Sequence, residues 1–313
     1  MLGLKDHVLL PGYSGYAGTA AASLLPDNAM VNDLARAQGG LTGYVHPFDS
    51  DPDPDDMKTA LTVGLPVDVA LGKIDYLEVV GFSDHLATSR VWYRLLNCGF
   101  RLPAGAGTDA MTNFASLRGP IGTNRVFVQS GLPIDRRSWY AALKAGRSFA
   151  TNGPLLQLTL GGIGIGGELK VPVKGRRVAA RVTFRSIVPI DHLELVRNGA
   201  VLASLPLAGD RTALDTVLQV PVSESGWYLL RAFSDKAIEP VLDIYPFATT
   251  SPIYATVGGK PVRSPEDARY FLKWIDRLEQ GVQEHQGWNS DAEKADVLQR
   301  VQAARSEFHA RAE

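Results

Sequence analysis

The chain lacks most features that would mark a disulfide-stabilised, membrane-spanning or nucleic-acid-binding protein. Its 313 residues include a single cysteine, Cys98, which excludes an internal disulfide. Lys and Arg total 32 against 33 Asp and Glu, so there is no basic excess to attract nucleic acid or an anionic membrane. No apolar run reaches the ~18 residues of a membrane-spanning helix. The start of the chain also lacks the basic and apolar regions of a signal peptide. We expect a cytoplasmic chain as given, with neither nucleic acid nor membrane as partner, although a longer parent could be exported.

The first half of the chain alternates helical and extended patterns. Helices are expected over 26–40, 53–65 and 88–99, and strands over 41–47, 74–85 and 100–110. A further helix is expected over 135–146, with Asp135 as its cap. Repeated helix–strand pairs predict an α/β fold in which helices cover parallel strands.

The second half changes character twice. Residues 155–245 contain short alternating runs, and Asn198-Gly199 is a typical two-residue hairpin turn. This predicts a β-sandwich of roughly immunoglobulin type. Two helices then follow, capped by Ser264 and by Ser290, and we expect them to pair antiparallel. The expected domains are an α/β domain over 1–153, the sandwich over 154–247 and a helical hairpin over 248–313.

Polar side chains follow the three expected strands of the first half. "YVHP" offers His46, "GFSDH" offers Asp84 and His85, and "GAGTDA" offers Asp109. The carboxyl ends of parallel strands converge, so these side chains are expected together, with Pro47 ending its strand and His46 facing inward. His and carboxylate ligands suit Zn, Mn or Fe. The alternative for each residue alone is a structural histidine or a turn-capping aspartate.

A resemblance to a known family rests on four motifs. "GGLTGYVHPF", "YLEVVGFSDH", "AGAGTDA" and "AGRSFATNGPLL" resemble the C-terminal part of the CehA/McbA-type metallohydrolases. These belong to the PHP (polymerase and histidinol phosphatase) superfamily. The resemblance implies a distorted βα barrel with divalent metals that hydrolyses phosphoesters or, in this branch, carbamate and aryl esters. It also implies that His46, His85 and Asp109 are metal ligands.

The chain departs from that family in having no His-x-His strand, which members carry before the region seen here. We therefore expect a partial barrel that lacks its first strands. Three ligands can still hold one divalent metal with an open position for water. His85 is then either a ligand or a general base, and Asp84 and Asp109 are the further catalytic candidates. His7 is a possible additional ligand, or a residue of a surface turn.

The expected function is what the resemblance implies for these residues. A metal-bound hydroxide would attack a phosphotriester or phosphodiester with loose selectivity. The alternatives are hydrolysis of carbamates or carboxylic esters at the same site, and an inactive remnant that serves as a binding or assembly module. Candidate ligands for substrate oxygens, each with a salt bridge or turn contact as its alternative, are Arg118, Arg125, Arg147 and Asn152.

An incomplete barrel would leave open strand edges and an uncovered apolar face. The simplest way to cover both is a twofold dimer in which each half-barrel supplies the wall that the other lacks. We expect such a homodimer to bury more than ~2,000 Å² in total.

Overall fold

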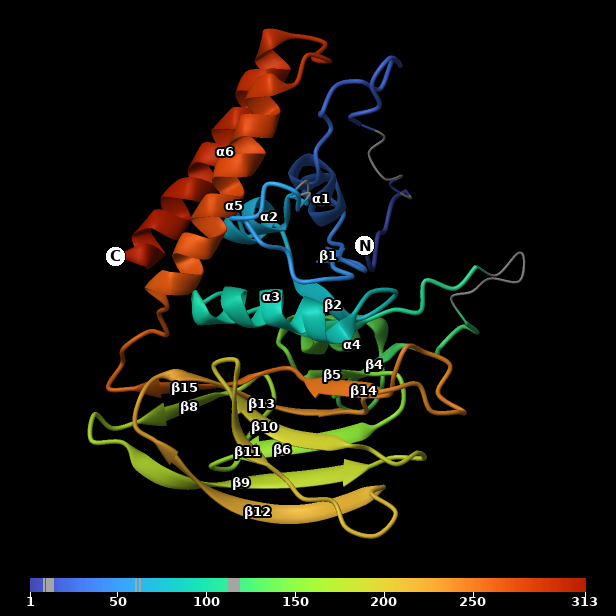
Figure 1. Ribbon diagram of the computed structural model, residues 1–313, viewed down its shortest axis with the longest axis vertical. Coiled ribbons are helices and arrows are strands. Elements are labelled where there is room, and N and C mark those ends of the chain that lie inside the picture. Colours follow the sequence, from blue (N-terminus) through green and yellow to red (C-terminus); the bar gives the residue numbers. More distant parts are fainter. Residues whose placement is uncertain (8, 10–13, 60, 62, 112–118) are drawn as a thin grey trace. The chain divides into compact units, whose positions relative to one another are not determined.

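The computed structural model describes residues 1–313 except 8, 10–13, 60, 62 and 112–118 (Figure 1). The described residues form a mixed α/β protein with six helices and several sheets. They group into two units, which we number 1 and 2. Unit 1 comprises Met1–Tyr44, Pro52–Asp75 and Arg263–Glu313, and unit 2 comprises Val45–Asp51 and Tyr76–Val262. The domain limits expected at residues 153 and 247 stay a prediction. None of the described helices has the length and apolar character that a membrane span needs.

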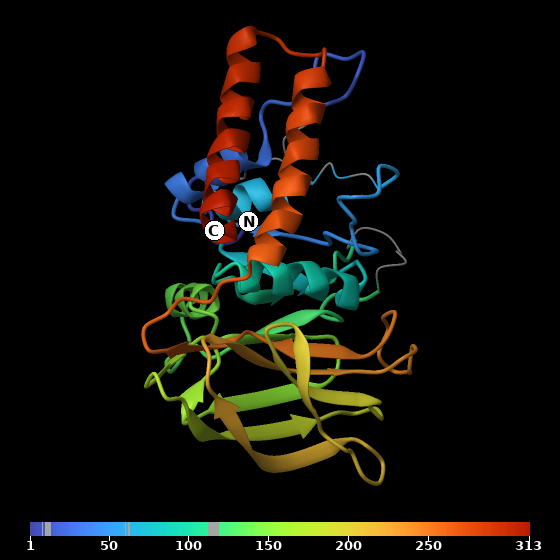
Figure 2. The same cartoon turned by 60° about the vertical axis from the view of Figure 1, so that its left-hand side comes forward.

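Unit 1 is mainly helical, and its largest feature is an antiparallel pair of long helices, α5 (Pro265–Glu284) and α6 (Asp291–Ala312) (Figure 2). Their expected caps are confirmed, because Ser264 accepts from the N–H of Asp267 and Ser290 from that of Glu293. The Phe271 and Phe308 rings are fully buried and lie 5.0 Å apart between their centroids. The unit also contains α1 (Asn28–Ala37), the short strand β1 (Gly43–Tyr44) and α2 (Leu65–Ala70).

The prediction of a helix over residues 53–65 is wrong. The described residues of that stretch form turns, and helix α2 begins only at Leu65. The side chain of Asp53 accepts from the N–H of Asp55, and that of Asp56 accepts from Lys58, each at 2.9 Å. Aspartate side chains offer the backbone these local bonds in place of helical ones, which explains why turns form here.

Unit 2 opens with a strand–helix–strand segment. Strands β2 (Tyr76–Val80) and β3 (Ala104–Ala106) pair in parallel, as expected, and α3 (His85–Asn97) connects them. The expected strand over 74–85 ends earlier, however. Asp84 is the N-cap of α3 and accepts from the N–H of Ala87 at 2.6 Å. His85 is therefore the first residue of a helix and does not lie at the end of a strand.

The rest of unit 2 is two sheets packed face to face around one apolar core. One sheet has the order β11 (Ala200–Ser204), β10 (His192–Arg197), β13 (Gly226–Phe233), β14 (Phe247–Thr250), β5 (Ser148–Thr151) and β4 (Arg125–Val128), with β15 (Ile253–Val257) on β13 and β8 (Glu168–Val171) on β15. The other has the order β12 (Ala213–Val222), β9 (Arg176–Arg185), β6 (Leu155–Leu160) and β7 (Ile163–Gly164). Helix α4 (Arg136–Lys144) lies between β4 and β5 in the chain and is capped by Asp135, as expected. The core includes Phe184 and Tyr228, both with no exposed surface.

Two turns fix the geometry of these sheets. The hairpin at Asn198-Gly199 is confirmed, because both residues have positive φ (50° and 87°) and Arg197 faces Ala200 in the register. Gly166, with φ 76°, lies against another stretch of backbone. A Cβ at this position would overlap the Ala145 oxygen and lie 2.7 Å from that of Gly146.

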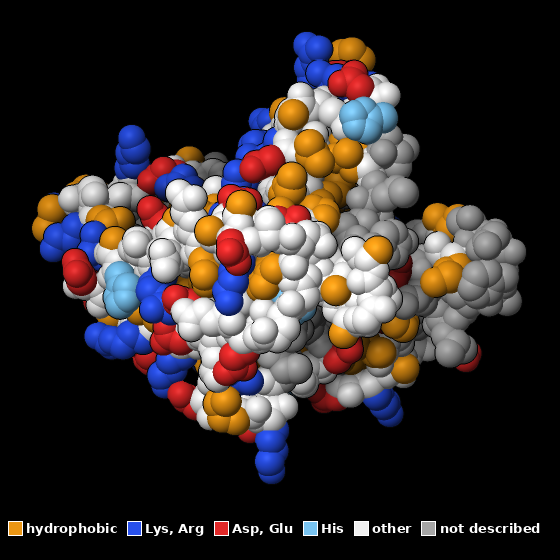
Figure 3. Space-filling model, turned by 90° about the horizontal axis from the view of Figure 1, so that it is seen from above, with side chains coloured by type: hydrophobic (Ala, Val, Ile, Leu, Met, Phe, Trp, Pro, Cys, Tyr) orange, Lys and Arg blue, Asp and Glu red, His pale blue; other side chains and the backbone are white. Residues whose placement is uncertain are grey.

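Charges of both signs are mixed on the surface seen in Figure 3. Lys and Arg side chains lie interspersed with Asp and Glu side chains on part of that face. This distribution agrees with the formal net charge of −1.

Candidate functional site

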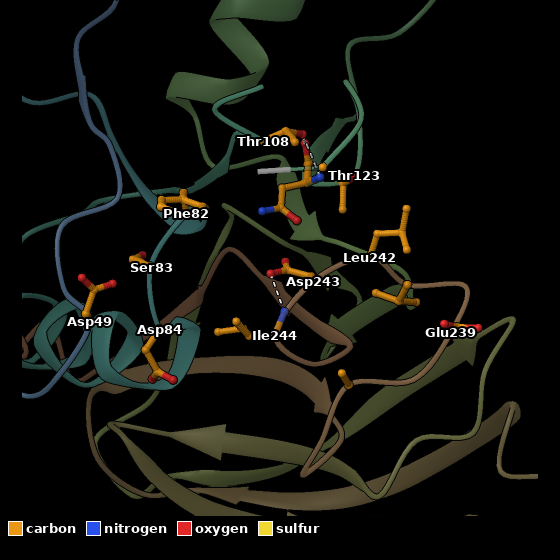
Figure 4. Close-up of a pocket in the computed structure, with 15 residues that line it drawn as sticks. Asp49, Phe82, Ser83, Asp84, Thr108, Thr123, Glu239, Leu242, Asp243 and Ile244 are labelled. Atoms are coloured by element: carbon orange, nitrogen blue, oxygen red, sulfur yellow. Dashed lines mark hydrogen bonds between the residues drawn. The ribbon is translucent and has the colours of Figure 1, made fainter. Parts of the chain in front are cut away.

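The principal candidate site is a pocket of about 990 Å³ within unit 2 (Figure 4). Its lining includes Gly81–Asp84, which follows β2, and Thr108, which follows β3. The loop over 237–244 contributes the opposite side. The carboxyl ends of parallel strands are the usual position of a ligand site in α/β sheets, because the loops that leave them converge. The pocket thus occupies the position that the strand-end motifs indicate.

The pocket is rich in hydrogen-bond acceptors. Its lining contains four carboxylates, from Asp49, Asp84, Glu239 and Asp243, and among the described lining residues there is no Lys, Arg or His. Figure 4 shows Asp243 near the middle, with Asp49 and Asp84 to one side and Glu239 to the other. The amide oxygen of the lining residue Asn124 is buried and has no partner in the described part of the chain. Such a lining favours ligands that donate hydrogen bonds or carry positive charge.

The Asp243 carboxylate is held in a fixed orientation. Its Oδ2 accepts from Asn152 Nδ2 at 2.8 Å and lies 3.1 Å from His85 Nε2. Its Oδ1 accepts from the N–H of Ile244 at 2.7 Å. Burial raises the pKa of Asp243, but the His85 and Asn152 contacts outweigh that effect and bring the pKa below its ordinary value. The side chain is therefore ionised at neutral pH and accepts from all three neighbours.

His85 lies behind Asp243 and outside the pocket lining. The residue has no exposed surface, and its ring contacts those of Tyr245 and Phe247 at centroid distances of 5.2 and 5.3 Å. Its Nδ1 atom has no hydrogen-bond partner in the described part of the chain. In this arrangement the imidazole positions Asp243, and its roles as ligand or general base stay predictions.

Asp84 lines the pocket at the first turn of α3. One carboxylate oxygen caps the helix, and the other accepts from the Tyr245 hydroxyl at 3.1 Å. Burial raises the pKa of Tyr245 above its ordinary value, so the hydroxyl stays protonated and remains a donor. Asp84 is thus fixed in place by the same loop that carries Asp243.

The three expected metal ligands do not form a metal site in this structure. Among the described residues, no three His, Cys, Asp or Glu side chains gather closely enough to hold a metal ion. His46, expected to face inward, is an exposed residue with φ 34°, and Asp109 is exposed with φ 55°. His85 is buried against Asp243. The residues present therefore do not fit the expected three-ligand centre, and no step is assigned to a metal here.

Glu78 is a candidate that the sequence patterns missed. It lies within β2, is 6% exposed, and accepts from the backbone N–H of His46 at 3.0 Å. Two glycines leave room for its carboxyl group: a Cβ at Gly81 would overlap it, and a Cβ at Gly107 would lie 2.5 Å from Oε2. Burial raises the pKa of Glu78 to about 7, although the His46 N–H opposes the shift. A carboxyl that titrates near neutral pH, behind the pocket residue Gly81, can give or take a proton.

The residues expected to bind substrate oxygens have mixed positions. Arg118 lies outside the described residues. Arg125 and Arg147 are exposed and are not among the pocket-lining residues. Asn152 is 3% exposed and uses its amide on Asp243, on the Tyr245 carbonyl and on the Phe247 N–H. It supports the site from behind the lining.

A single acidic residue inside a buried strand, as in "YLEVV", is the signal that points to Glu78. Asp243, in "VLDIYPF", has no comparable local signal. Comparison of the chain with family models, with curated proteins and with solved structures finds no match.

Proposed function

We propose that the chain is a hydrolase that cleaves a small-molecule ester in the pocket at Asp84 and Asp243. The observation that carries the proposal is a large pocket at the carboxyl ends of two parallel strands, with an ionised and immobilised carboxylate at its centre. The motif resemblance to PHP-type hydrolases supports the same reaction class.

The charge of the pocket narrows the substrate class. A phosphodiester is an anion, and carboxylates of Asp49, Asp84, Glu239 and Asp243 would repel it because the described lining supplies no basic side chain. Phosphotriesters, carbamates and carboxylic esters are neutral and avoid this repulsion. The proposal therefore favours neutral esters, including those with a cationic substituent.

The side chains have distinct tasks in this proposal. Asp243 accepts a hydrogen bond from water and orients it toward the ester, while Asn152 and His85 keep the carboxylate in place. Glu78 titrates near neutral pH and is the nearby group suited to proton transfer.

A binding module without hydrolytic activity is the second candidate. It is favoured by the absence of a three-ligand metal group among the described residues. In that case the carboxylates select a ligand with donor or cationic groups, and the pocket holds it unchanged.

We expect Asp243→Asn to lower kcat/KM by about 100-fold, because the variant loses the charge that orients water. The assay compares a p-nitrophenyl dialkyl phosphotriester, a p-nitrophenyl carbamate and bis(p-nitrophenyl) phosphate, each with EDTA and with added Mn or Zn. Asp235→Asn is the matched control, since Asp235 is exposed in the same unit and outside the pocket.

The outcomes separate the candidates. Neutral esters turned over faster than the diester, with only the Asp243 variant impaired, would support the proposal. Binding of these compounds without turnover in any metal condition would support the binding module. Equal activity of Asp243→Asn and the parent would exclude the proposed role of this carboxylate.

The finer architecture is also proposed. We infer that β2, α3 and β3 belong to a partial PHP-type barrel and that the two packed sheets are immunoglobulin-like, from the parallel pairing and the motif resemblance.

The homodimer stays a prediction, since its basis is the incomplete barrel. Sedimentation velocity at micromolar concentration checks it. A fully active species at the chain mass of 33.8 kDa would contradict the dimer.

A further inference from the structure

A second pocket, of about 580 Å³, lies wholly within unit 1. Helices α2, α5 and α6 supply an apolar part of its lining, which includes Val67, Leu278, Val282, Val297 and Val301. The volume is in the range of pockets that hold drug-sized molecules. The first pocket belongs to unit 2, so the two sites share no residue.

The lining contains two carboxylates, Asp27 and Asp68, of which Asp27 is paired with Arg300. Asp68, on α2, is 2% exposed, and its Oδ2 accepts from the Tyr44 hydroxyl at 2.7 Å. The Tyr44 oxygen in turn accepts from Asn28 Nδ2 at 2.8 Å. Within the described part of the chain, Asp68 has no ion pair with a basic side chain. A buried carboxylate with one neutral donor lacks the compensation that buried charges normally have.

The basic residues nearby already have other partners. Arg300 pairs with Asp27 at 2.8 Å, and Lys73 pairs with Asp33 at 2.5 Å. Arg277, which lines the pocket, donates to the carbonyl oxygens of Asp56 and Thr59.

His285 is the remaining basic residue of the lining, and its Nε2 lies 2.7 Å from the Ala22 carbonyl oxygen. Burial and, to a smaller extent, the charge of Asp27 raise the pKa of Asp68 to about 7, while the Tyr44 hydroxyl and the charges of Arg300 and Lys73 oppose the shift. Arg300 and Lys73 thus act on Asp68 only from a distance, and the carboxylate forms no ion pair within the described part of the chain.

We propose that this pocket binds a small apolar molecule that carries a protonated amine, with the ammonium group paired to Asp68 and the apolar body against the valines of α2, α5 and α6. The cation would supply the partner that the buried carboxylate lacks, and the apolar wall would gain from exclusion of water.

Three probes with one apolar body and different charges test this proposal by calorimetric titration of the full chain: tryptamine, tryptophol and indole-3-acetate. We expect tryptamine to bind most tightly and indole-3-acetate most weakly. Affinities that are equal for the three probes, or tightest for the acid, would overturn the proposal. Failure of all three to bind at millimolar concentration would overturn it as well.

Two variants locate the site. Asp68→Asn keeps an acceptor for Tyr44 and removes the charge, so tryptamine affinity should fall about 10–100-fold while that of tryptophol stays the same. Gly64→Ala, at φ −75°, places a methyl group 3.8 Å from Asp68 Oδ2 and 3.6 Å from the Tyr44 hydroxyl, which are ordinary contact distances. It should weaken tryptamine binding, and because Gly64 is the N-cap of α2, it should lower the free energy of unfolding by no more than about 1 kcal/mol.

Glu307→Gln is the matched control, because Glu307 is an exposed acid of α6 outside the pocket. It should leave all three affinities unchanged. An Asp68→Asn variant that is folded by circular dichroism and binds tryptamine as tightly as the parent would refute the assignment of Asp68.

Discussion

Replacing Gly166 with alanine is expected to lower the free energy of unfolding by about 2–5 kcal/mol, which combines two costs. The first is a left-handed backbone, since φ is 76°, and L-residues with a Cβ disfavour that region. The second is steric, because the new methyl group would overlap the backbone oxygen of Ala145. The N–H of Gly166 also donates to the Pro252 carbonyl at 2.9 Å, so the segment cannot move away without losing this bond.

Chemical denaturation followed by tryptophan fluorescence measures this loss. Gly259→Ala is the matched control in the same unit, because φ is 73° but no other atom lies within 4 Å of the added methyl group. It should show only the backbone cost of about 1–2 kcal/mol. If the two variants lose the same free energy of unfolding, the backbone near Gly166 moves to accommodate the methyl group and the steric cost is absent.

The second large effect concerns Glu78 and pH. Its pKa is raised from 4.5 in the unfolded chain to about 7 in the folded protein, chiefly by burial. Between these values the folded state binds more protons than the unfolded state, so stability falls as pH rises through this range. The contribution is fully present below pH 4.5 and is lost above about pH 7. A shift of this size corresponds to about 3 kcal/mol.

Glu78→Gln removes this dependence, since glutamine is neutral at every pH. We expect the stability of the variant, relative to the parent, to increase by about 3 kcal/mol between pH 4 and pH 8.5. Denaturation curves at these two pH values measure it. Asp68, with a pKa raised to about 7, titrates in the same range but contributes equally to both proteins and cancels in the difference.

The matching control is Glu224→Gln, because Glu224 is 79% exposed. The difference in free energy of unfolding between Glu224→Gln and the parent should not vary with pH. If the difference in free energy of unfolding between Glu78→Gln and the parent is also independent of pH, the carboxyl group of Glu78 is solvated in the folded protein.

The sequence was informative where structure depends on neighbours in the chain. Ser264, Ser290 and Asp135 cap their helices as predicted, because a cap bond joins residues two or three positions apart. The Asn198-Gly199 hairpin was predicted for a similar reason. The error at 53–65 was also local, since the turn-forming tendency of Asp53 and Asp56 outweighed the apolar pattern.

The site was predicted less well because distant contacts determine it. The strand-end motifs include Asp84, which lines the pocket. They did not indicate that His85 begins a helix and faces Asp243. Nor could they identify Asp243, whose position depends on residues far away in the chain.

The contacts that close the pocket also constrain the order of folding. The hydrogen bond between Asp84 and Tyr245 spans 161 positions in the chain, and that between His85 and Asp243 spans 158. Contacts of such long range carry a loop-closure entropy that falls when nearer contacts shorten the effective loop, so we expect them to form late. During synthesis from the amino end, Asp84 and His85 therefore lack the loop that carries Asp243 and Tyr245 until nearly all of unit 2 has left the ribosome.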